Sequence, residues 1–182
     1  MTEAGPDVAT GSEAVPAAVS TRAHWLVFFA IAGAVIIVDQ VAKAWLVANV
    51  SPGDVVEVLG DWVRLIFSQN SGALFGLFRD NAVLFGIVSL AVIGLIVAYH
   101  GRAGRSFYMS VALGLLLGGA IGNLVDRLRL GYVVDFIDIG IGDLRFYTFN
   151  LADSAISLAI VLLIGAALFP VLTRLGERTA DG

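Results

Sequence analysis

The segment GGAIGNLVDRLRLGYVVDF, residues 118–136, decides how this chain is organised. It follows an apolar run long enough to enter a membrane, yet it contains Asn123, Asp126, Arg127, Arg129 and Asp135. A charged side chain at the centre of a bilayer costs about 2.5 to 3.5 kcal/mol on insertion scales. Polar residues at this place therefore indicate a functional site at the end of a membrane span.

The composition of the whole chain also indicates a membrane protein. Of the 182 residues, 58% are hydrophobic and 14% are charged, whereas a soluble domain has about 25% charged residues. The chain has no cysteine, which excludes disulfides, thiolate zinc sites and a cysteine nucleophile. Its net charge is -4 and no basic face is visible, so nucleic-acid binding is not expected.

Hydropathy predicts a mainly α-helical membrane protein with four transmembrane helices. Each apolar segment can cross about 30 Å of hydrocarbon at 1.5 Å per residue. The expected spans are approximately residues 25–47, 82–99, 107–125 and 154–172, within one domain of residues 23–172. Residues 1–22 are expected to form a disordered tail rather than a signal peptide, because a signal peptide begins with a basic region. Residues 173–182 form a second tail.

The basic residues predict the orientation of these spans. Arg22 precedes the first span, Arg102 and Arg105 lie in the short connection HGRAGRS, and Arg174 and Arg178 follow the fourth span. By the positive-inside rule, both tails and this connection face the cytoplasm. The other two connections then lie outside the cytoplasm.

These two outer connections resemble short strands more than ordinary loops. Residues 55–67 alternate in part and are rich in Val, Ile, Trp and Phe, with Gly60 and Asp61 as a turn candidate. The segment GYVVDFIDIGIGDLRFYTFN, residues 131–150, has the same character. We expect a small extracytoplasmic β platform at the outer surface of the membrane that the helices span.

Several common catalytic arrangements do not fit the sequence. His24 and His100 are both expected at cytoplasmic ends, away from the polar residues, so a Ser–His pair is not expected near them. No His-Glu-x-x-His pattern of a zinc protease is present. Neither a metal nor another cofactor is expected.

The outer ends of the spans bring together acids, amides and one lysine. Asp39 and Lys43 are spaced as a helical ion pair, and Asp126 is expected to belong to a supporting polar network with Asn123 and Arg127. Asp138 and Asp143 are expected to be solvated in a glycine-rich outer loop. The complete set expected to meet at this level also includes Asn70, Asp135, Asn150 and Asp153.

Asp135 and Asp153 differ from the other acids because each lies among apolar residues, in YVVDFI and FNLADSAI. Two carboxylates in a poorly hydrated place cannot easily both ionise, so they share a proton. Such a pair suits an aspartic protease, and it also suits a proton or ion relay. We expect Asp153, at a helix start, to favour the charged form and Asp135 the protonated form.

Two other classes of protein fit the sequence less well. A small proton-coupled transporter or channel subunit would use acids within its spans, but the polar residues here gather at one face and the middles of the second and fourth spans carry none. A lipid-binding scaffold would fit the topology, yet it gives no reason for paired acids in apolar surroundings.

Four motifs together resemble bacterial lipoprotein signal peptidase, the signal peptidase II family: DQVAK at 39–43, QNSGALFG at 69–76, GGAIGNLVDRLRLGYVVDF at 118–136 and FNLADSAIS at 149–157. The resemblance runs from Trp25 to about Phe169. One departure is Ala42, where the family usually has Thr or Ser before the lysine.

The resemblance implies an aspartic endopeptidase that cleaves the signal peptide of a diacylglyceryl-modified prolipoprotein just before the lipobox cysteine. It implies Asp135 and Asp153 as the catalytic dyad. It also implies a monomer in the bacterial cytoplasmic membrane, in contact with lipid and sensitive to globomycin. The residues expected to bind substrate or support the dyad are Asp39, Lys43, Asn70, Gly72, Asn123, Asp126, Arg127, Asn150 and Ala152.

Overall fold

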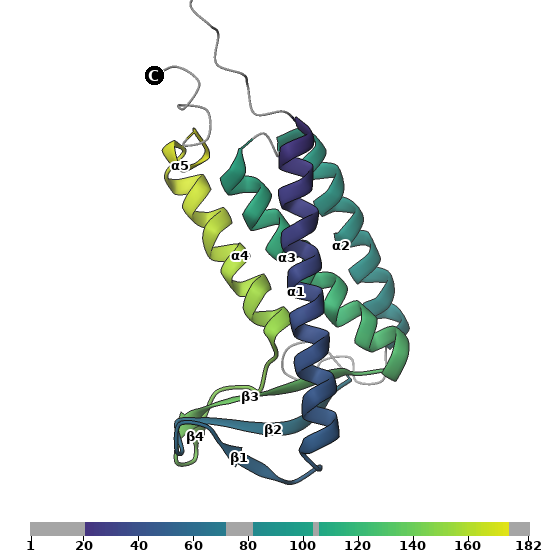
Figure 1. Cartoon of the computed structure of the whole chain (residues 1–182), viewed down its shortest axis with the longest axis vertical. Helices are drawn as coiled ribbons and strands as arrows, with labels where there is room; N and C mark the ends of the chain where they lie inside the picture. The colour runs from purple at the N-terminus through teal and green to yellow at the C-terminus, as the bar shows by residue number, and fades with distance from the viewer. Residues whose placement is uncertain (1–20, 72–81, 104–105, 175–182) are drawn as a thin grey trace, which may run out of the picture.

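The computed structural model describes residues 21–71, 82–103 and 106–174. Its helices are α1 (Thr21–Asn49), α2 (Ala82–Ala103), α3 (Phe107–Leu130), α4 (Leu151–Leu168) and the short α5 (Val171–Arg174). Its strands are β1 (Val55–Glu57), β2 (Val63–Asn70), β3 (Val133–Ile141) and β4 (Leu144–Arg145). The four long helices form a bundle, and the sheet lies across one end of it (Figure 1). Most of the two predicted tails, and Gly72, lie outside the described residues.

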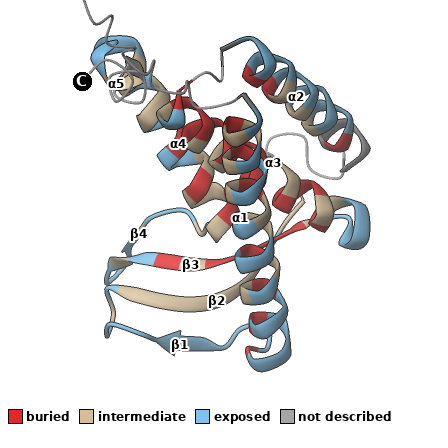
Figure 2. Cartoon of the chain, turned by 45° about the horizontal axis from the view of Figure 1, so that its top comes forward, coloured by how far each residue is buried: buried red, intermediate tan, exposed pale blue. Residues whose placement is uncertain are grey.

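Helix α3 is the centre of the bundle. The other three long helices all pack against it, and the buried residues concentrate along it and the helix faces turned toward it (Figure 2). Phe28 of α1, Ile96 of α2 and Leu113 of α3 belong to one buried cluster. A Cβ atom on Gly118 would lie 2.7 Å from Cβ of Val35, so glycine at this position lets α1 and α3 approach closely.

The outer faces of the bundle are apolar. Leu26 of α1, Leu95 of α2 and Leu168 of α4 are each about two-thirds or more exposed, at 71%, 69% and 68%. By length and composition, helices over Arg22–Asn49, Phe107–Leu130 and Leu151–Leu168 can cross a membrane, while the described apolar part of α2, Gly86–Arg102, is shorter. The chain is therefore mostly helical with three clear candidate spans, and the fourth span stays a prediction.

Helix α3 is longer than the third span that the sequence predicts. Helix α3 continues past residue 125 to Leu130, so Asn123, Asp126 and Arg127 lie inside the helix and not after it. The helix can continue because neighbouring side chains satisfy its polar groups. It ends at Gly131, whose φ of 81° is in the left-handed region that favours glycine.

The predicted strands are confirmed as a four-stranded antiparallel sheet with the order β1-β2-β3-β4. Strands β1 and β2 form the expected hairpin, and Gly60 lies in its turn with a φ of 52°. Between Leu65 and Ser68 the register of β2 on β3 shifts, which places Ser68 opposite Asp135. Bulges of this kind often occur beside active sites, where they redirect side chains.

Asp138 was expected in a solvated loop, and that expectation was wrong. It lies in β3, is only 3% exposed, and forms ion pairs with Arg64 at 2.7 Å and Arg145 at 2.9 Å. Burial raises the pKa of Asp138, but the hydrogen bonds from Arg145 and Arg64 outweigh it and the pKa lies below its usual value. The partner Arg64 was not apparent because it lies 74 positions from Asp138 in the sequence.

Candidate active site

Asp135 and Asp153 come from two elements that meet at the junction of bundle and sheet. Asp135 belongs to β3, and Asp153 lies in the first turn of α4. The segment just before α4 pairs with β3, because Ile137 and Phe149 exchange backbone hydrogen bonds of 2.8 and 3.1 Å. This pairing fixes the start of α4 beside β3. It therefore fixes the position of Asp153 relative to Asp135.

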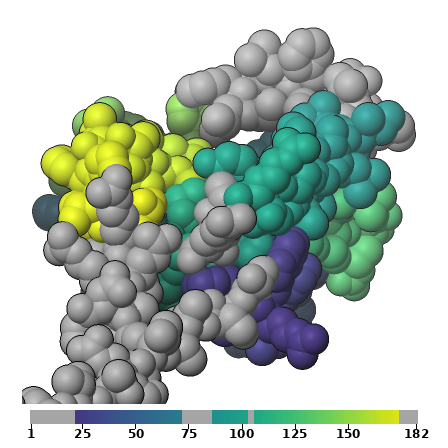
Figure 3. All heavy atoms as spheres, turned by 90° about the horizontal axis from the view of Figure 1, so that it is seen from above, coloured from purple at the N-terminus to yellow at the C-terminus, as the bar shows by residue number. Residues whose placement is uncertain are grey.

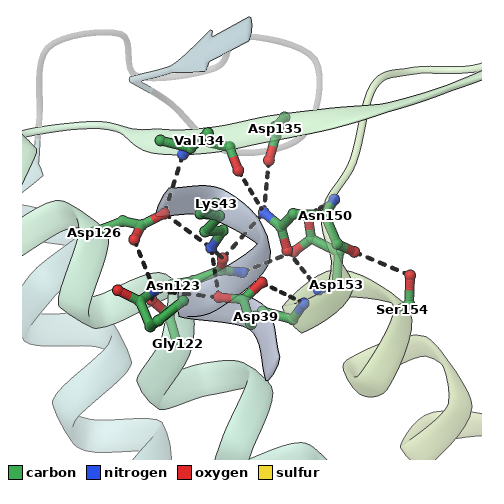
Figure 4. Close-up of polar contacts among 12 residues, drawn as sticks. Asp39, Lys43, Gly122, Asn123, Asp126, Val134, Asp135, Asn150, Asp153 and Ser154 are labelled. Atoms are coloured by element: carbon green, nitrogen blue, oxygen red, sulfur yellow. Dashed lines mark hydrogen bonds and ion pairs between the residues drawn. The ribbon is translucent and has the colours of Figure 1, made fainter. Parts of the chain in front are cut away.

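Asn150 connects these two elements through one side chain. Its Nδ2 donates to Oδ1 of Asp135 at 2.6 Å, and its Oδ1 accepts from the backbone N–H of Asp153 at 2.9 Å. The second contact makes Asn150 the N-cap of α4, and a capping box with Asp153 completes it. Asn150 is fully buried. The same residue thus begins the helix that carries one acid and holds the other acid (Figure 4).

Asn123 of α3 holds the second carboxylate. Its Nδ2 donates to Oδ1 of Asp153 at 2.7 Å, while its Oδ1 accepts from Asn150 at 3.2 Å. Asp135, Asn150, Asn123 and Asp153 therefore form one continuous chain of hydrogen bonds (Figure 4). Each acid accepts a hydrogen bond from one of the two amides, and the two amides are hydrogen-bonded to each other.

Asn70 of β2 is the other partner of Asp135, with its Nδ2 donating to Oδ2 at 2.9 Å. Burial raises the pKa of Asp135 to about 6, repulsion from Asp153 adds to this, and the hydrogen bonds from Asn70 and Asn150 oppose it. Loss of water around the carboxylate disfavours its charged form. Asp135 is thus an acid that can carry a proton close to neutral pH.

Lys43 forms the centre of a buried charge cluster next to the dyad. Its Nζ lies 2.8 Å from Oδ2 of Asp39 and 2.8 Å from Oδ2 of Asp126. It also donates to Oδ1 of Asn123 at 3.3 Å. The predicted ion pair within α1 is present, and Asp126 extends it to α3. Asp126 in turn accepts from the backbone N–H of Val134 at 3.1 Å, beside Asp135.

Asp39 anchors the start of α4 to α1. Its Oδ1 accepts from the backbone N–H of Ala152 at 3.0 Å, which is one of the N–H groups that a helix start leaves without a partner inside the helix. A Cβ atom on Gly122 would lie 2.9 Å from Oδ2 of Asp39 and 3.3 Å from Cβ of Ala152. Glycine at 122 therefore lets α3, Asp39 and α4 meet closely.

Gln40 belongs to the same network, and the sequence analysis missed it. Its Nε2 donates to Oδ1 of Asp126 at 2.9 Å and to Oδ2 of Asp39 at 3.2 Å. The signal was its place beside Asp39 in DQVAK. An uncharged amide in a membrane span is a weaker signal than the charged Asp39 and Lys43 of the same motif.

Of the other predicted residues, Arg127 lies in α3 and donates to the backbone oxygen of Asn123 at 3.3 Å. It also attracts Asp153, Asp135 and Asp126 electrostatically. Gly72 lies outside the described residues. Among the described residues, no group of three or more His, Cys, Asp or Glu is arranged to hold a metal ion.

The two histidines lie at the opposite end of the bundle. His24 is near the start of α1 and His100 near the end of α2. Nε2 of His100 is 3.1 Å from Oγ of Ser110, and its Nδ1 has no hydrogen-bond partner in the described part of the chain. Among residues 21–71, 82–103 and 106–174, no acid orients the ring, so this contact does not form a catalytic triad there.

The comparison with protein families gives a match over most of the chain. Residues 31–169 match the model described as Signal peptidase (SPase) II. A lipoprotein signal peptidase of Syntrophomonas wolfei is 41% identical over 71% of this chain and 85% of its own length. One of Caulobacter vibrioides is 38% identical over 91% of this chain and 99% of its own length.

Solved structures show the same likeness. A bacterial membrane enzyme determined by the in meso method at 2.3 Å resolution is 34% identical, with a TM-score of 0.73 over 78% of this chain and 87% of its own. A second, at 1.9 Å, has a TM-score of 0.72 and the same 34% identity over 78% of this chain and 92% of its own.

Proposed function

This chain belongs to the signal peptidase II family, and we propose that it is an aspartic endopeptidase whose catalytic dyad is Asp135 and Asp153. Membership makes it a multi-pass membrane peptidase that removes signal peptides from prolipoproteins. The finer proposal is that the substrate carries a diacylglyceryl group and that cleavage occurs just before the modified lipobox cysteine.

The observation that carries this proposal is the hydrogen-bonded chain Asp135–Asn150–Asn123–Asp153. Each amide donates to one carboxylate and leaves that carboxylate with further oxygen lone pairs for water or substrate. The raised pKa of Asp135, about 6, supports a proton shared within the pair. These features favour a catalytic dyad over two independent structural acids.

In the proposed reaction, a water molecule lies between the two carboxyl groups. The ionised carboxylate takes a proton from this water as its oxygen attacks the carbonyl carbon of the scissile peptide. The protonated carboxyl polarises the carbonyl and then gives its proton to the leaving nitrogen as the C–N bond breaks. The products are a new carboxyl end on the signal peptide and a free amine on the lipidated cysteine.

We assign the proton at the start of the cycle to Asp135 and the charge to Asp153. Asp153 lies in the first turn of α4, where the helix dipole favours a negative charge, whereas Asp135 lies in a strand, which has no such dipole. Arg127 attracts both carboxylates and is suited to stabilise the negative charge that develops during attack.

The proposed topology has four spans, with both termini in the cytoplasm and the dyad near the outer leaflet. Helix α2 has 22 residues, about 33 Å at 1.5 Å per residue, which is enough to span. The sheet then lies at the outer surface. A reporter fused near Gly142 should be reachable only from outside, and a cytoplasmic signal there would overturn this orientation.

A direct assay tests the proposed activity and substrate. The purified protein, as a monomer in detergent, should cleave a diacylglyceryl-modified prolipoprotein and leave the unmodified precursor intact. Globomycin should block the cleavage. Equal cleavage of modified and unmodified precursor would contradict the proposed requirement for lipid, and no cleavage by folded protein would contradict the activity itself.

A further inference from the structure

An apolar cavity, called the groove below, lies at the end of the bundle remote from the dyad. Its volume is about 670 Å³, and it lies between α2, α3 and α4. Leu95 and Tyr99 of α2, Leu116 of α3, and Leu163 and Ala167 of α4 are among the residues that line it. It is apolar over most of its surface. No part of the proposed cleavage site reaches it.

The groove exists because α2 and α4 diverge. Both helices pack against α3, but they make few contacts with each other. Tyr108 of α3 donates to the backbone oxygen of Leu162 in α4 at 2.8 Å, which fixes the position of α4 against α3. Seen from this end, α4 and α5 lie apart from α2, with α3 between them (Figure 3). The groove is therefore a built feature that opens to the side of the bundle.

The rim of the groove carries a positive charge. Arg102, in the last turn of α2, lines the groove and is exposed, and Thr173 of α5 lines it as well. In the part of the chain that the structure describes, the acidic residues all lie in the sheet, its loops or the helix segments around the dyad. Arg22 adds a second cation at the remote end. An occupant with apolar chains and a negative head fits this arrangement.

We propose that this groove binds an anionic phospholipid, with an acyl chain between α2 and α4 and the phosphate against Arg102. Basic pockets between membrane helices on the cytoplasmic side commonly bind such lipids, and in the proposed topology this end faces the cytoplasm. A signal peptide is a poorer occupant, because its N-terminal region is basic and Arg102 would repel it. The site is separate from the dyad and does not depend on the proposed peptidase activity.

The test is a lipid competition on the purified full-length protein. The protein is incubated with equal amounts of phosphatidylglycerol and phosphatidylcholine that have identical acyl chains, and the retained lipids are counted by native mass spectrometry. Wild type should retain the anionic lipid about fivefold more, the effect of one arginine near an anionic head group. Equal retention of the two lipids would overturn the proposal.

Point variants inside and outside the groove locate the site. Arg102→Gln should abolish the preference, whereas Arg22→Gln, which removes a cation at the same end but outside the groove lining, should keep it. Ala167→Phe fills the groove and should lower retention of both lipids. If Ala167→Phe does not fold, Ala98→Phe fills the same groove and replaces it. A preference that survives Arg102→Gln would contradict the proposal. So would a groove-filling variant that raises KM for prolipoprotein and leaves lipid retention unchanged, since the groove would then bind the signal peptide.

Discussion

The side chain of Asn150 donates to Asp135 at 2.6 Å while it caps the helix that carries Asp153. The start of α4 and the protonation of Asp135 are therefore coupled through one amide. Local folding at the N-cap and the geometry of the acids cannot vary independently. This coupling explains why polar residues lie at the end of an apolar segment: they hold two acids in a fixed relationship at the junction of bundle and sheet.

Removing Asn70 should shift the pH dependence of activity upward. Asn70 donates to Asp135 at 2.9 Å and lowers its pKa, so Asn70→Ala should raise that pKa further above about 6. A hydrogen bond to a charged group contributes about 1.5–3 kcal/mol, so the alkaline limb of kcat/KM should move up by about one to two pH units. The control is Gln69→Ala, because Gln69 is the exposed residue next to Asn70; this variant should leave the alkaline limb of kcat/KM at the wild-type pH. A limb that stays or moves down in Asn70→Ala would contradict the assignment.

Asp135 should make the protein less stable as the pH rises. Its pKa is about 6 in the folded state and about 3.9 when unfolded, so folding disfavours its ionised form. The cost is absent below about pH 4 and complete above about pH 6, where it reaches at most about 3 kcal/mol. Asp135→Asn removes this dependence. The Tm of the variant minus that of wild type, measured in detergent, should therefore increase from pH 4 to pH 7, and a constant or falling difference would refute the pKa shift.

Lys43 should be essential for stability, because it neutralises two buried acids. Lys43→Met leaves Asp39 and Asp126 without their cation, which should cost about 3–5 kcal/mol. Thermal unfolding in detergent measures the loss. The double variant Lys43→Met with Asp126→Asn removes one of the stranded charges and should recover part of it. If the double variant is no more stable than the single one, the buried charge is not the cause.

Asp138 should matter for stability rather than for chemistry. Asp138→Asn leaves Arg64 and Arg145 without a buried carboxylate, which should cost about 1–3 kcal/mol. The matched control is Asp143→Asn, an exposed acid in the neighbouring turn, which should change the Tm little. Cleavage by folded Asp138→Asn should stay within a few-fold of wild type. Equal Tm values for the two variants would contradict the structural role of the ion pairs.

The helices, the hairpin and the dyad candidates could be predicted from the sequence because each depends on a local sequence pattern. The length of the apolar segments predicted the four long helices, and apolar surroundings distinguished Asp135 and Asp153 from the other acids. The burial of Asp138 could not be predicted from the sequence, since it depends on the distant partner Arg64. Gln40 was missed for the same reason, because its acceptor Asp126 lies on another helix.

The most direct test of the account is the cleavage rate of Asp135→Asn and Asp153→Asn on diacylglyceryl-modified prolipoprotein. Asn keeps the shape of the side chain but cannot exchange the proton, and acid–base catalysis contributes about 10²–10⁴-fold to a rate. Each variant, shown to be folded by its Tm, should lose at least about a hundredfold in kcat, while Asp143→Asn stays near wild type. Near-normal turnover by either folded variant would contradict the dyad.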